Sequence, residues 1–375
     1  MLKIIFLINF AFAGIEPLKV RVRIAKSVPV IRISGKDLKN TIFPKNLESS
    51  YQGNKTIQFN CLKSQYISKP TLFASLSSNV GLLEFDDHKY QGKVLIVSKG
   101  KDRSCDVINE TTMESYIGTL LAKEMNAVWP IEALKAQAVA ARTYAYSKMK
   151  SKNVSVSAGY ETFYDLESSE RHQVGGQFFD ANQNTVRAAN ATKGEILITG
   201  AGKVTPIFFH AKCGGRTLRP DQVWENAVPG YDSVICPFCD HHGKSEWSST
   251  LNNERFRSFL NFLQQKKHIP KIIDADGKLF IPFSEEFKSQ VRVYVGEKFY
   301  TFNKSLFRNY FGRILVPSNY FKIIHQGNKI ELTGKGLGHG VGMCQLGSLD
   351  MAQKGYDYKA ILAHYFPNHR LEKIY

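Results

Sequence analysis

Residues 113–149 have the sequence MESYIGTLLAKEMNAVWPIEALKAQAVAARTYAYSKM. This stretch predicts two consecutive helices, and the interpretation of the flanking sequence depends on them. Thr111, followed three residues later by Glu114, is a capping-box signature, so we expect a first helix over 113–125. Trp129 and Pro130 interrupt that helix, but proline is tolerated in the first turn of a helix. The alanine-rich sequence that follows strongly favours a second helix over 131–149.

The sequence on either side of these helices is less helical. Residues 14 to about 110 are rich in strand patterns, with Gly, Asn and Ser clusters between them. The glycine-rich segment near the C-terminus is followed by two short helical patterns, the first of which Gly355 can end. The chain is therefore predicted to be of mixed α and β class. The predicted strands are 20–24, 28–33, 94–97, 194–199, 204–210 and 291–295, and the further predicted helices are 256–264, 344–354 and 358–365.

Composition and charge narrow the class of protein. The chain has 375 residues, which suggests two or three domains, and its 43% apolar and 22% charged content excludes wholesale disorder. Lys and Arg outnumber Asp and Glu by 50 to 33, and the net charge of +17 suits a polyanionic partner. No apolar run reaches the ~18 residues of a membrane span. The positive charge is the single feature of the sequence that favours a nucleic-acid partner. No helix-turn-helix, zinc-finger or RNA-recognition signature is present to support it.

The first residues resemble an export signal. Lys3 supplies a positive charge, residues 4–12 are apolar apart from Asn9, and Ala11 and Ala13 are small residues at the −3 and −1 positions of a cleavage site. We therefore predict a signal peptide over 1–13 and an exported protein of the periplasm or cell envelope, with no membrane segment after cleavage. The alternative, a buried N-terminal strand, lacks the expected alternation.

Three side chains of the two helices are candidates for chemistry. Glu124 comes near the end of the first helix, where the helix dipole and apolar neighbours disfavour a charged carboxylate and suit a general acid. The alternative is a solvated glutamate paired with Lys123 or Lys135. Lys135 and Arg142 are seven residues apart, so they share one helix face and could bind a sugar or a carboxylate, or remain solvated.

The run GKGLGHGVGMCQ, residues 334–345, is the most unusual part of the sequence. Its alternating glycines allow positive φ angles and a close approach of the backbone to a ligand. The run matches neither a phosphate loop nor a dinucleotide fingerprint. His339, flanked by glycines, is predicted to be exposed in a cleft rather than buried in a core.

Three motifs together resemble the SpoIID/LytB family of bacterial sporulation and cell-wall proteins. They are AKEM…WP…ALKAQAVAART (122–143), FFHAKCGGRT (208–217) and GHGVGMCQ…GY…IL.HYFP (338–367). The resemblance covers about residues 90–370, and the first and last motifs are long. It implies an α+β fold: a SpoIID-like catalytic domain from 91–250 and 331–375 and a smaller inserted α/β domain at 251–330. Residues 14–90 lie outside the resemblance and are predicted only as a β-rich N-terminal region, which could serve for wall binding or docking.

The resemblance further implies a lytic transglycosylase that cleaves peptidoglycan glycan strands. Glu124 corresponds to the family's catalytic glutamate, while Lys135, Arg142, His339, Gln345 and Gln173 are carried over as substrate-binding residues. Such an enzyme needs one carboxyl group, in contrast to the pair used by ordinary glycosidases, and it needs no cofactor for chemistry. The alternative is a non-catalytic glycan-binding protein that stimulates an N-acetylmuramoyl-L-alanine amidase. The predicted partners are therefore glycan strands and a cell-wall amidase, but no nucleic acid.

The cysteines depart from the family pattern. The family often binds a metal through Cys and His in the loop after the second helix, but residues 164–174 contain no cysteine. A structural zinc site could instead be formed by Cys213, Cys236 and Cys239 together with His210. Disulfide bonds between these cysteines are an equally good interpretation in an exported protein. In addition, Cys61 could pair with Cys105, and Cys344 is a candidate free thiol beside the substrate-binding segment.

Overall fold

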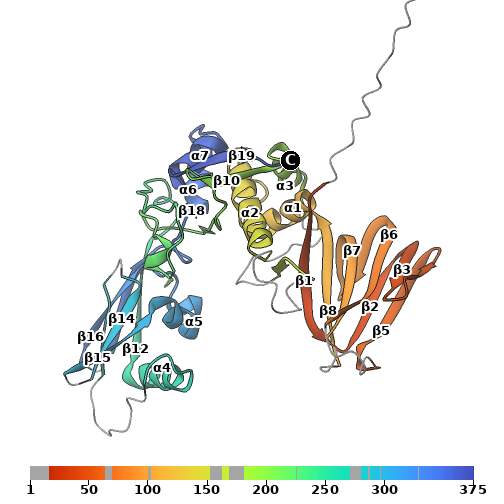
Figure 1. The fold of residues 1–375 in the computed structure, drawn as a ribbon. Helices are drawn as coiled ribbons and strands as arrows, with labels where there is room; N and C mark the ends of the chain where they lie inside the picture. Colours follow the sequence, from red (N-terminus) through yellow and green to blue (C-terminus); the bar gives the residue numbers. More distant parts are fainter. Residues whose placement is uncertain are drawn as a thin grey trace, which may run out of the picture.

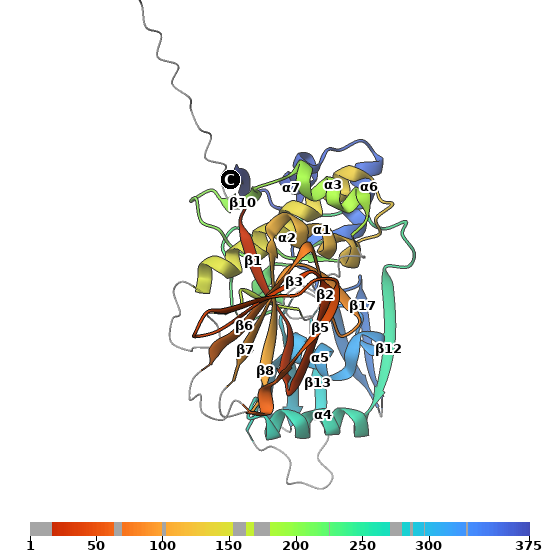
Figure 2. The same cartoon turned by 90° about the vertical axis from the view of Figure 1, so that its right-hand side faces the viewer.

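The computed structural model describes residues 17–63, 70–99, 103–152, 163–168, 181–224, 226–270, 280–285, 288–295, 297–327 and 329–375. The predicted signal peptide at 1–13 and the substrate-binding candidate Gln173 lie outside these residues. Figure 1 shows a helical core with two β-rich parts below it, one on each side. Figure 2, turned by 90°, shows the N-terminal β-rich part in front of the inserted one. The mixed α and β class is confirmed.

The N-terminal part is one large sheet with its own core. Its strand order is β4-β3-β6-β7-β8-β1-β9, and β2 pairs with β5 and β6. Ile31, Ile33 and Val94 are among the residues of its core, and all three are fully buried. The Cys61–Cys105 disulfide joins the segment after β5 to the start of β8, which confirms that predicted pairing. The strands are β1 (Lys19–Val28), β2 (Val30–Lys36), β3 (Leu38–Ile42), β4 (Leu47–Ser50), β5 (Asn54–Asn60), β6 (Thr71–Phe85), β7 (His88–Ser98), β8 (Cys105–Thr112) and β9 (Leu166–Glu167).

Strand β8 leads directly into the helical core. Thr112 caps α1, because its side chain accepts a hydrogen bond from the amide of Ser115. The cap is therefore one residue later than the sequence predicts, and Glu114 binds Arg142 instead of completing a capping box. The core contains α1 (Met113–Glu124), α2 (Ile131–Lys152), α3 (Gln183–Ala191), α6 (Gln345–Gln353), α7 (Tyr358–Tyr365), β10 (Glu195–Thr199), β11 (Phe209–His210), β18 (Met343–Cys344) and β19 (His369–Lys373).

Helix α2 lies at the centre of this core. Its alanines at 133, 136, 138, 140 and 141 are all fully buried, so small side chains let the neighbouring helices approach closely. Two short strand pairs close the core around it: β10 pairs antiparallel with β19, and β11 pairs parallel with β18. Both pairs join segments far apart in the sequence. The predicted strand 204–210 forms a strand only at 209–210.

The inserted part has a separate, phenylalanine-rich core. Phe256, Phe259, Phe307 and Phe321 are fully buried there. Two three-stranded sheets, β12-β17-β16 and β13-β14-β15, form its β structure. The elements are β12 (Glu246–Asn252), α4 (Asn253–Gln265), β13 (Phe280–Phe283), β14 (Gln290–Val295), β15 (Lys298–Asn303), α5 (Lys304–Leu315), β16 (Phe321–Gln326) and β17 (Lys329–Lys335).

The domain boundaries that the sequence analysis predicts, at 90/91, 250/251 and 330/331, fall inside the strands β7, β12 and β17, respectively. The N-terminal sheet therefore continues to Thr112, and the inserted part includes all of β12 and β17. Among the described residues, no helix is long and apolar enough to cross a membrane.

Candidate active site

Glu124 is the last residue of α1 and is half-buried. Burial raises the pKa of its carboxyl group above the ordinary value, whereas Gln345 and the positive charge of Arg313 act in the opposite direction. The net upward shift favours the protonated acid. The end of a helix has partial negative charge, so its dipole acts in the same sense as burial.

Two neighbours of Glu124 were not identified from the sequence. Arg313 comes from the last turn of α5, so the inserted part brings a cation toward the acid. Gly312 interrupts α5 with a φ of 79° immediately before it. Tyr116 lies two turns earlier on α1; it is buried, and Glu124 contributes to the raised pKa of its phenol. The position of Arg313 depends on the fold of the inserted part, which no local pattern reveals.

Gln345 joins the glycine-rich segment to the acid. Its Nε2 donates a hydrogen bond to the main-chain oxygen of Glu124 at 3.3 Å. The chain reaches this position through Gly342, whose φ is 73°. A Cβ atom there would lie 2.1 Å from the carbonyl oxygen of Phe208, so both the conformation and the packing require glycine. The structure thus places Gln345, a substrate-binding candidate, against the main chain of the candidate acid.

His339 is surrounded by the rings of other aromatic side chains. Its ring centroid lies 5.3 Å from that of Trp224, 5.7 Å from that of His210 and 6.2 Å from that of Phe208. Burial, with further contributions from His210 and Arg308, lowers the pKa of His339 to about 3. Its Nδ1 accepts a hydrogen bond from the amide of Val341, so the proton of the neutral ring is on Nε2. His339 is therefore a half-buried neutral donor, not a cation that could stabilise negative charge.

Arg142 has a structural position, contrary to the prediction that it binds substrate. It is fully buried and pairs with Glu114 at 2.5 Å. It also donates to the carbonyl oxygens of Ala189 and Glu195. Tyr375, beyond β19, donates its hydroxyl to the same Glu114. A guanidinium enclosed in this way joins α1, α2, α3 and β10 and leaves no room for a sugar.

Lys135 remains partly accessible on α2. Its Nζ pairs with Glu132 at 2.7 Å and lies 5.6 Å from the ring centroid of Tyr358. Lys135 and Arg142 thus share a helix but not an environment. Of the two cations, the structure leaves only Lys135 available for a ligand.

The cysteine-rich segments meet at β18, which contains Cys344. Cys213, Cys236 and Cys239, which the sequence groups together, are joined by Cys344 rather than by His210. His210 instead donates its Nδ1 proton to the carbonyl oxygen of Val341 at 3.0 Å. Cys344, expected as a separate thiol, is fully buried in the cluster.

Comparisons with known proteins address the family of this chain. The family model described as Stage II sporulation protein matches residues 101–198, which contain both α1 and α2. The chain is 26% identical over 289 residues to a protein named Amidase enhancer from Bacillus subtilis. It is also 26% identical over 267 residues to Stage II sporulation protein D from Bacillus amyloliquefaciens. The chain belongs to the SpoIID/LytB family.

A further relative is an uncharacterized protein of Brachyspira hyodysenteriae, 37% identical over 262 residues. That match covers 69% of this chain and 66% of the relative. The match to the amidase enhancer covers 66% of this chain but only 39% of the relative, and the match to the sporulation protein covers 69% and 74%. The family model itself spans residues 101–198, and the chain matches less than half of the length of the amidase enhancer.

Proposed function

We propose that this protein is a peptidoglycan lytic transglycosylase in which Glu124 acts as both acid and base. The observation that carries the proposal is the half-buried carboxyl group of Glu124 at the end of α1, with a raised pKa. A general acid is most effective when its pKa lies close to the working pH. Membership in a family with a relative named for sporulation supports the same substrate class.

In the proposed reaction, protonated Glu124 donates its proton to the glycosidic oxygen between N-acetylmuramic acid and N-acetylglucosamine. As that bond breaks, positive charge develops at the muramoyl C1. The carboxylate then takes the proton from the C6 hydroxyl, whose oxygen bonds to C1 and forms a 1,6-anhydro ring. The acid is regenerated, and no water is consumed.

The neighbours of Glu124 suit this single-acid chemistry. Hydrolases that use two carboxyl groups bring a second acid to the scissile bond. The charged side chain that lowers the pKa of Glu124 is a cation, Arg313. In the proposed complex Arg313 and Lys135 are the accessible cations that could bind the lactyl carboxylate of the muramoyl residue. Gln345 fixes the main chain at the acid.

The test incubates the purified chain and its Glu124→Gln variant with glycan strands, either bearing or stripped of stem peptides. Mass spectrometry then identifies the new ends. We expect 1,6-anhydromuramoyl ends with the wild type alone. Reducing ends would contradict the proposal and indicate a hydrolase.

A second candidate rests on the relative named Amidase enhancer. In this alternative the protein binds glycan strands and stimulates a cell-wall amidase without cutting them. Adding a purified N-acetylmuramoyl-L-alanine amidase to the same reactions separates the candidates. Faster release of stem peptides by both the wild type and Glu124→Gln, without new glycan ends, would favour the enhancer.

We also propose that the protein is exported to the periplasm or cell envelope. Its Cys61–Cys105 disulfide supports this location, because disulfides persist mainly in oxidising compartments. The net charge of +17 suits the acidic polymers of a cell envelope.

A further inference from the structure

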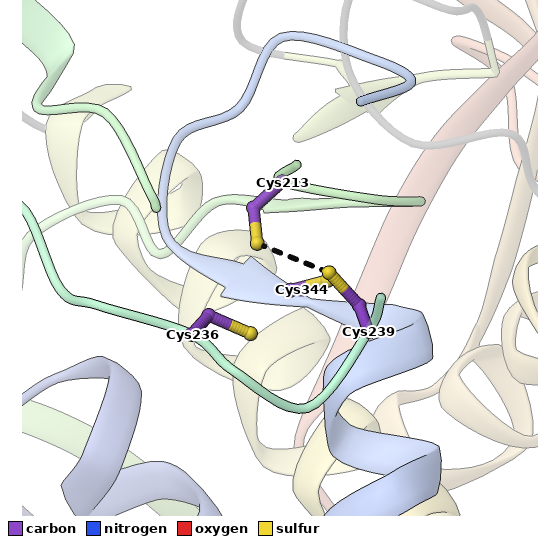
Figure 3. Close-up of side chains that lie close together, drawn as sticks. All are labelled: Cys213, Cys236, Cys239 and Cys344. Atoms are coloured by element: carbon purple, nitrogen blue, oxygen red, sulfur yellow. Dashed lines mark hydrogen bonds between the residues drawn. The ribbon is translucent and has the colours of Figure 1, made fainter. Parts of the chain in front are cut away.

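We propose that Cys213, Cys236, Cys239 and Cys344 bind one zinc ion as a closed, four-thiolate structural site. Figure 3 shows the four side chains converging from three separate segments of the chain. All four sulfur atoms lie within 4.8 Å of one another, and the residues are at most 1% exposed. This site is independent of the proposed cleavage reaction.

The spacing of the sulfur atoms fits a single metal ion. A tetrahedral zinc site has Zn–S bonds of about 2.3 Å, which places each pair of sulfurs about 3.8 Å apart. The Sγ atoms of Cys213 and Cys239 are 3.5 Å apart, and 4.8 Å is the upper limit for the whole group. Small movements of side chains would therefore suffice to complete the tetrahedron. Four sulfur ligands in this geometry select zinc or iron, as opposed to magnesium or calcium.

The backbone around the cysteines is arranged as in a metal site. Cys213 is followed by Gly214 with a φ of 74°, where a Cβ atom would lie 2.8 Å from the amide nitrogen of Gly336. Cys236 and Cys239 form a C-x-x-C turn, and the amide of Cys236 donates to the carbonyl oxygen of Gly215. The three cysteines are therefore held close by a tight turn and by a main-chain bond between their loops.

Cys344 completes the group from the start of α6. Its sulfur accepts a hydrogen bond from the amide of Gly347 at 3.3 Å, and such bonds stabilise a metal-bound thiolate. A Cβ atom at Gly347 would lie 2.8 Å from the sulfur of Cys236 and 2.0 Å from the hydroxyl of Tyr365. A glycine at this position thus makes room for the sulfur cluster.

Other uses of these residues fit less well. Two disulfides would need each sulfur to bond a single partner, but the arrangement gathers all four around one point, whereas Cys61 and Cys105 are joined as a pair. A site of three cysteines and His210 is less suitable, because the fourth ligand atom within 4.8 Å of the three sulfurs belongs to Cys344, and His210 is not part of this group. His241, His242 and Asp350 form a second cluster, but Lys354 pairs with Asp350 at 3.1 Å and competes with a cation there.

The zinc ion would hold the glycine-rich segment in place. Cys344 caps α6, and the next residue, Gln345, binds the main chain of Glu124. The same ion would join this point to the loop after β11 and to the C-x-x-C turn. The site would thus stabilise the framework next to the candidate acid without touching substrate.

The first experiment needs no variant. The chain is purified without chelator and its metal content is measured by mass spectrometry, and we expect one zinc per chain. The unreduced protein is then unfolded in the presence of EDTA, and its free thiols are alkylated. Four labelled cysteines are expected, since Cys61 and Cys105 are protected by their disulfide. Two or no labelled cysteines without metal, or iron in place of zinc, would overturn the proposal.

Variants then identify the ligands. Cys344→Ser and Cys239→Ser should each lower the zinc content at least tenfold, whereas His210→Gln and the pair His241→Ala/His242→Ala should retain one zinc. A Co²⁺-loaded wild-type chain should show thiolate-to-metal charge transfer and tetrahedral d–d bands. This spectrum tests the four-sulfur set even if a cysteine variant fails to fold. Octahedral bands, or zinc loss in His210→Gln, would contradict the assignment.

Discussion

The side-chain amide of Gln345 donates a hydrogen bond to the main-chain oxygen of Glu124, although 221 residues separate the two in the sequence. This bond fixes the end of α1 against the start of α6. The candidate acid is therefore positioned by a segment that is synthesised long after it. Its orientation depends on the glycine-rich turn that delivers Gln345.

Replacing Gln345 should impair catalysis more than folding. Gln345→Ala removes the donor at the acid, and a misplaced acid typically costs roughly 10- to 100-fold in rate. We expect a fall of this size in kcat for glycan cleavage with little change in KM. Gln353→Ala, at the exposed end of the same helix, is the control and should keep wild-type rates. Equal effects of the two variants would contradict the positioning role.

The pH dependence of cleavage should follow the charge at residue 313. Arg313 lowers the pKa of Glu124, so Arg313→Met should raise that pKa and move the high-pH limb of the kcat profile to higher pH. Arg313→Lys keeps the positive charge and should leave the limb near its wild-type position. Profiles measured with peptide-stripped strands would test this. A shift to lower pH in Arg313→Met would show that Glu124 is not the titrating acid.

Glu124 should also affect the pH dependence of stability. Its pKa is raised in the folded protein, so its favourable contribution is complete below the ordinary carboxyl pKa and is lost as pH rises through the folded value. Glu124→Gln cannot ionise. The variant should therefore be more stable than the wild type at neutral pH, and the advantage should disappear in acid. Urea unfolding at several pH values measures the difference.

The buried ion pair predicts a large loss of stability. Removing one partner of such a pair costs about 3–5 kcal/mol, because the other charge remains buried. We expect this loss in Arg142→Met, whose guanidinium otherwise pairs with Glu114. Lys135→Met on the same helix breaks a more accessible pair and should cost less than about 1 kcal/mol. Denaturant unfolding of both variants provides the comparison, and similar losses would argue against the structural role of Arg142.

Alanine substitutions at two glycines should distinguish the cost of backbone strain from the cost of a steric clash. Gly342 and Gly355 both have positive φ, but only at Gly342 would a Cβ atom meet the backbone, at 2.1 Å from Phe208. Gly355→Ala should cost ~1 kcal/mol from the conformation alone. Gly342→Ala should cost more and should also lower the cleavage rate. Thermal melts of the two variants test the difference, and equal melting temperatures would remove the case for close packing at Gly342.

The helices of the core could be predicted because their signals are local. The sequence predicts 113–125 and 131–149, and the structure has Met113–Glu124 and Ile131–Lys152. Proline and alanine act through the nearest turn of backbone, so no knowledge of distant segments is needed. The cap of α1 was misplaced because Thr111 and Thr112 are adjacent. The choice between them depended on Glu114 binding a residue in another helix.

The environments of the site residues could not be predicted in the same way. Helical spacing placed Lys135 and Arg142 on one face, but the burial of Arg142 depends on carbonyl groups of Ala189 and Glu195. Likewise, Cys344 joins the other cysteines only because β18 pairs with β11. Such contacts are set by the tertiary fold. The family resemblance supplied Glu124 and Gln345, but it could not supply Arg313 from the inserted part.

The pairing of β10 with β19, together with the bond from Tyr375 to Glu114, has a consequence for how the protein is made. Ribosomes and translocation channels release a polypeptide from its N-terminal end. Helix α1 and its acid therefore emerge well before the strand and the tyrosine that lock the surrounding framework. A nascent chain carries the acid without the scaffold that orients it. If the proposed function is correct, the cleavage activity is acquired late in biogenesis, once the segment that follows α7 has been delivered.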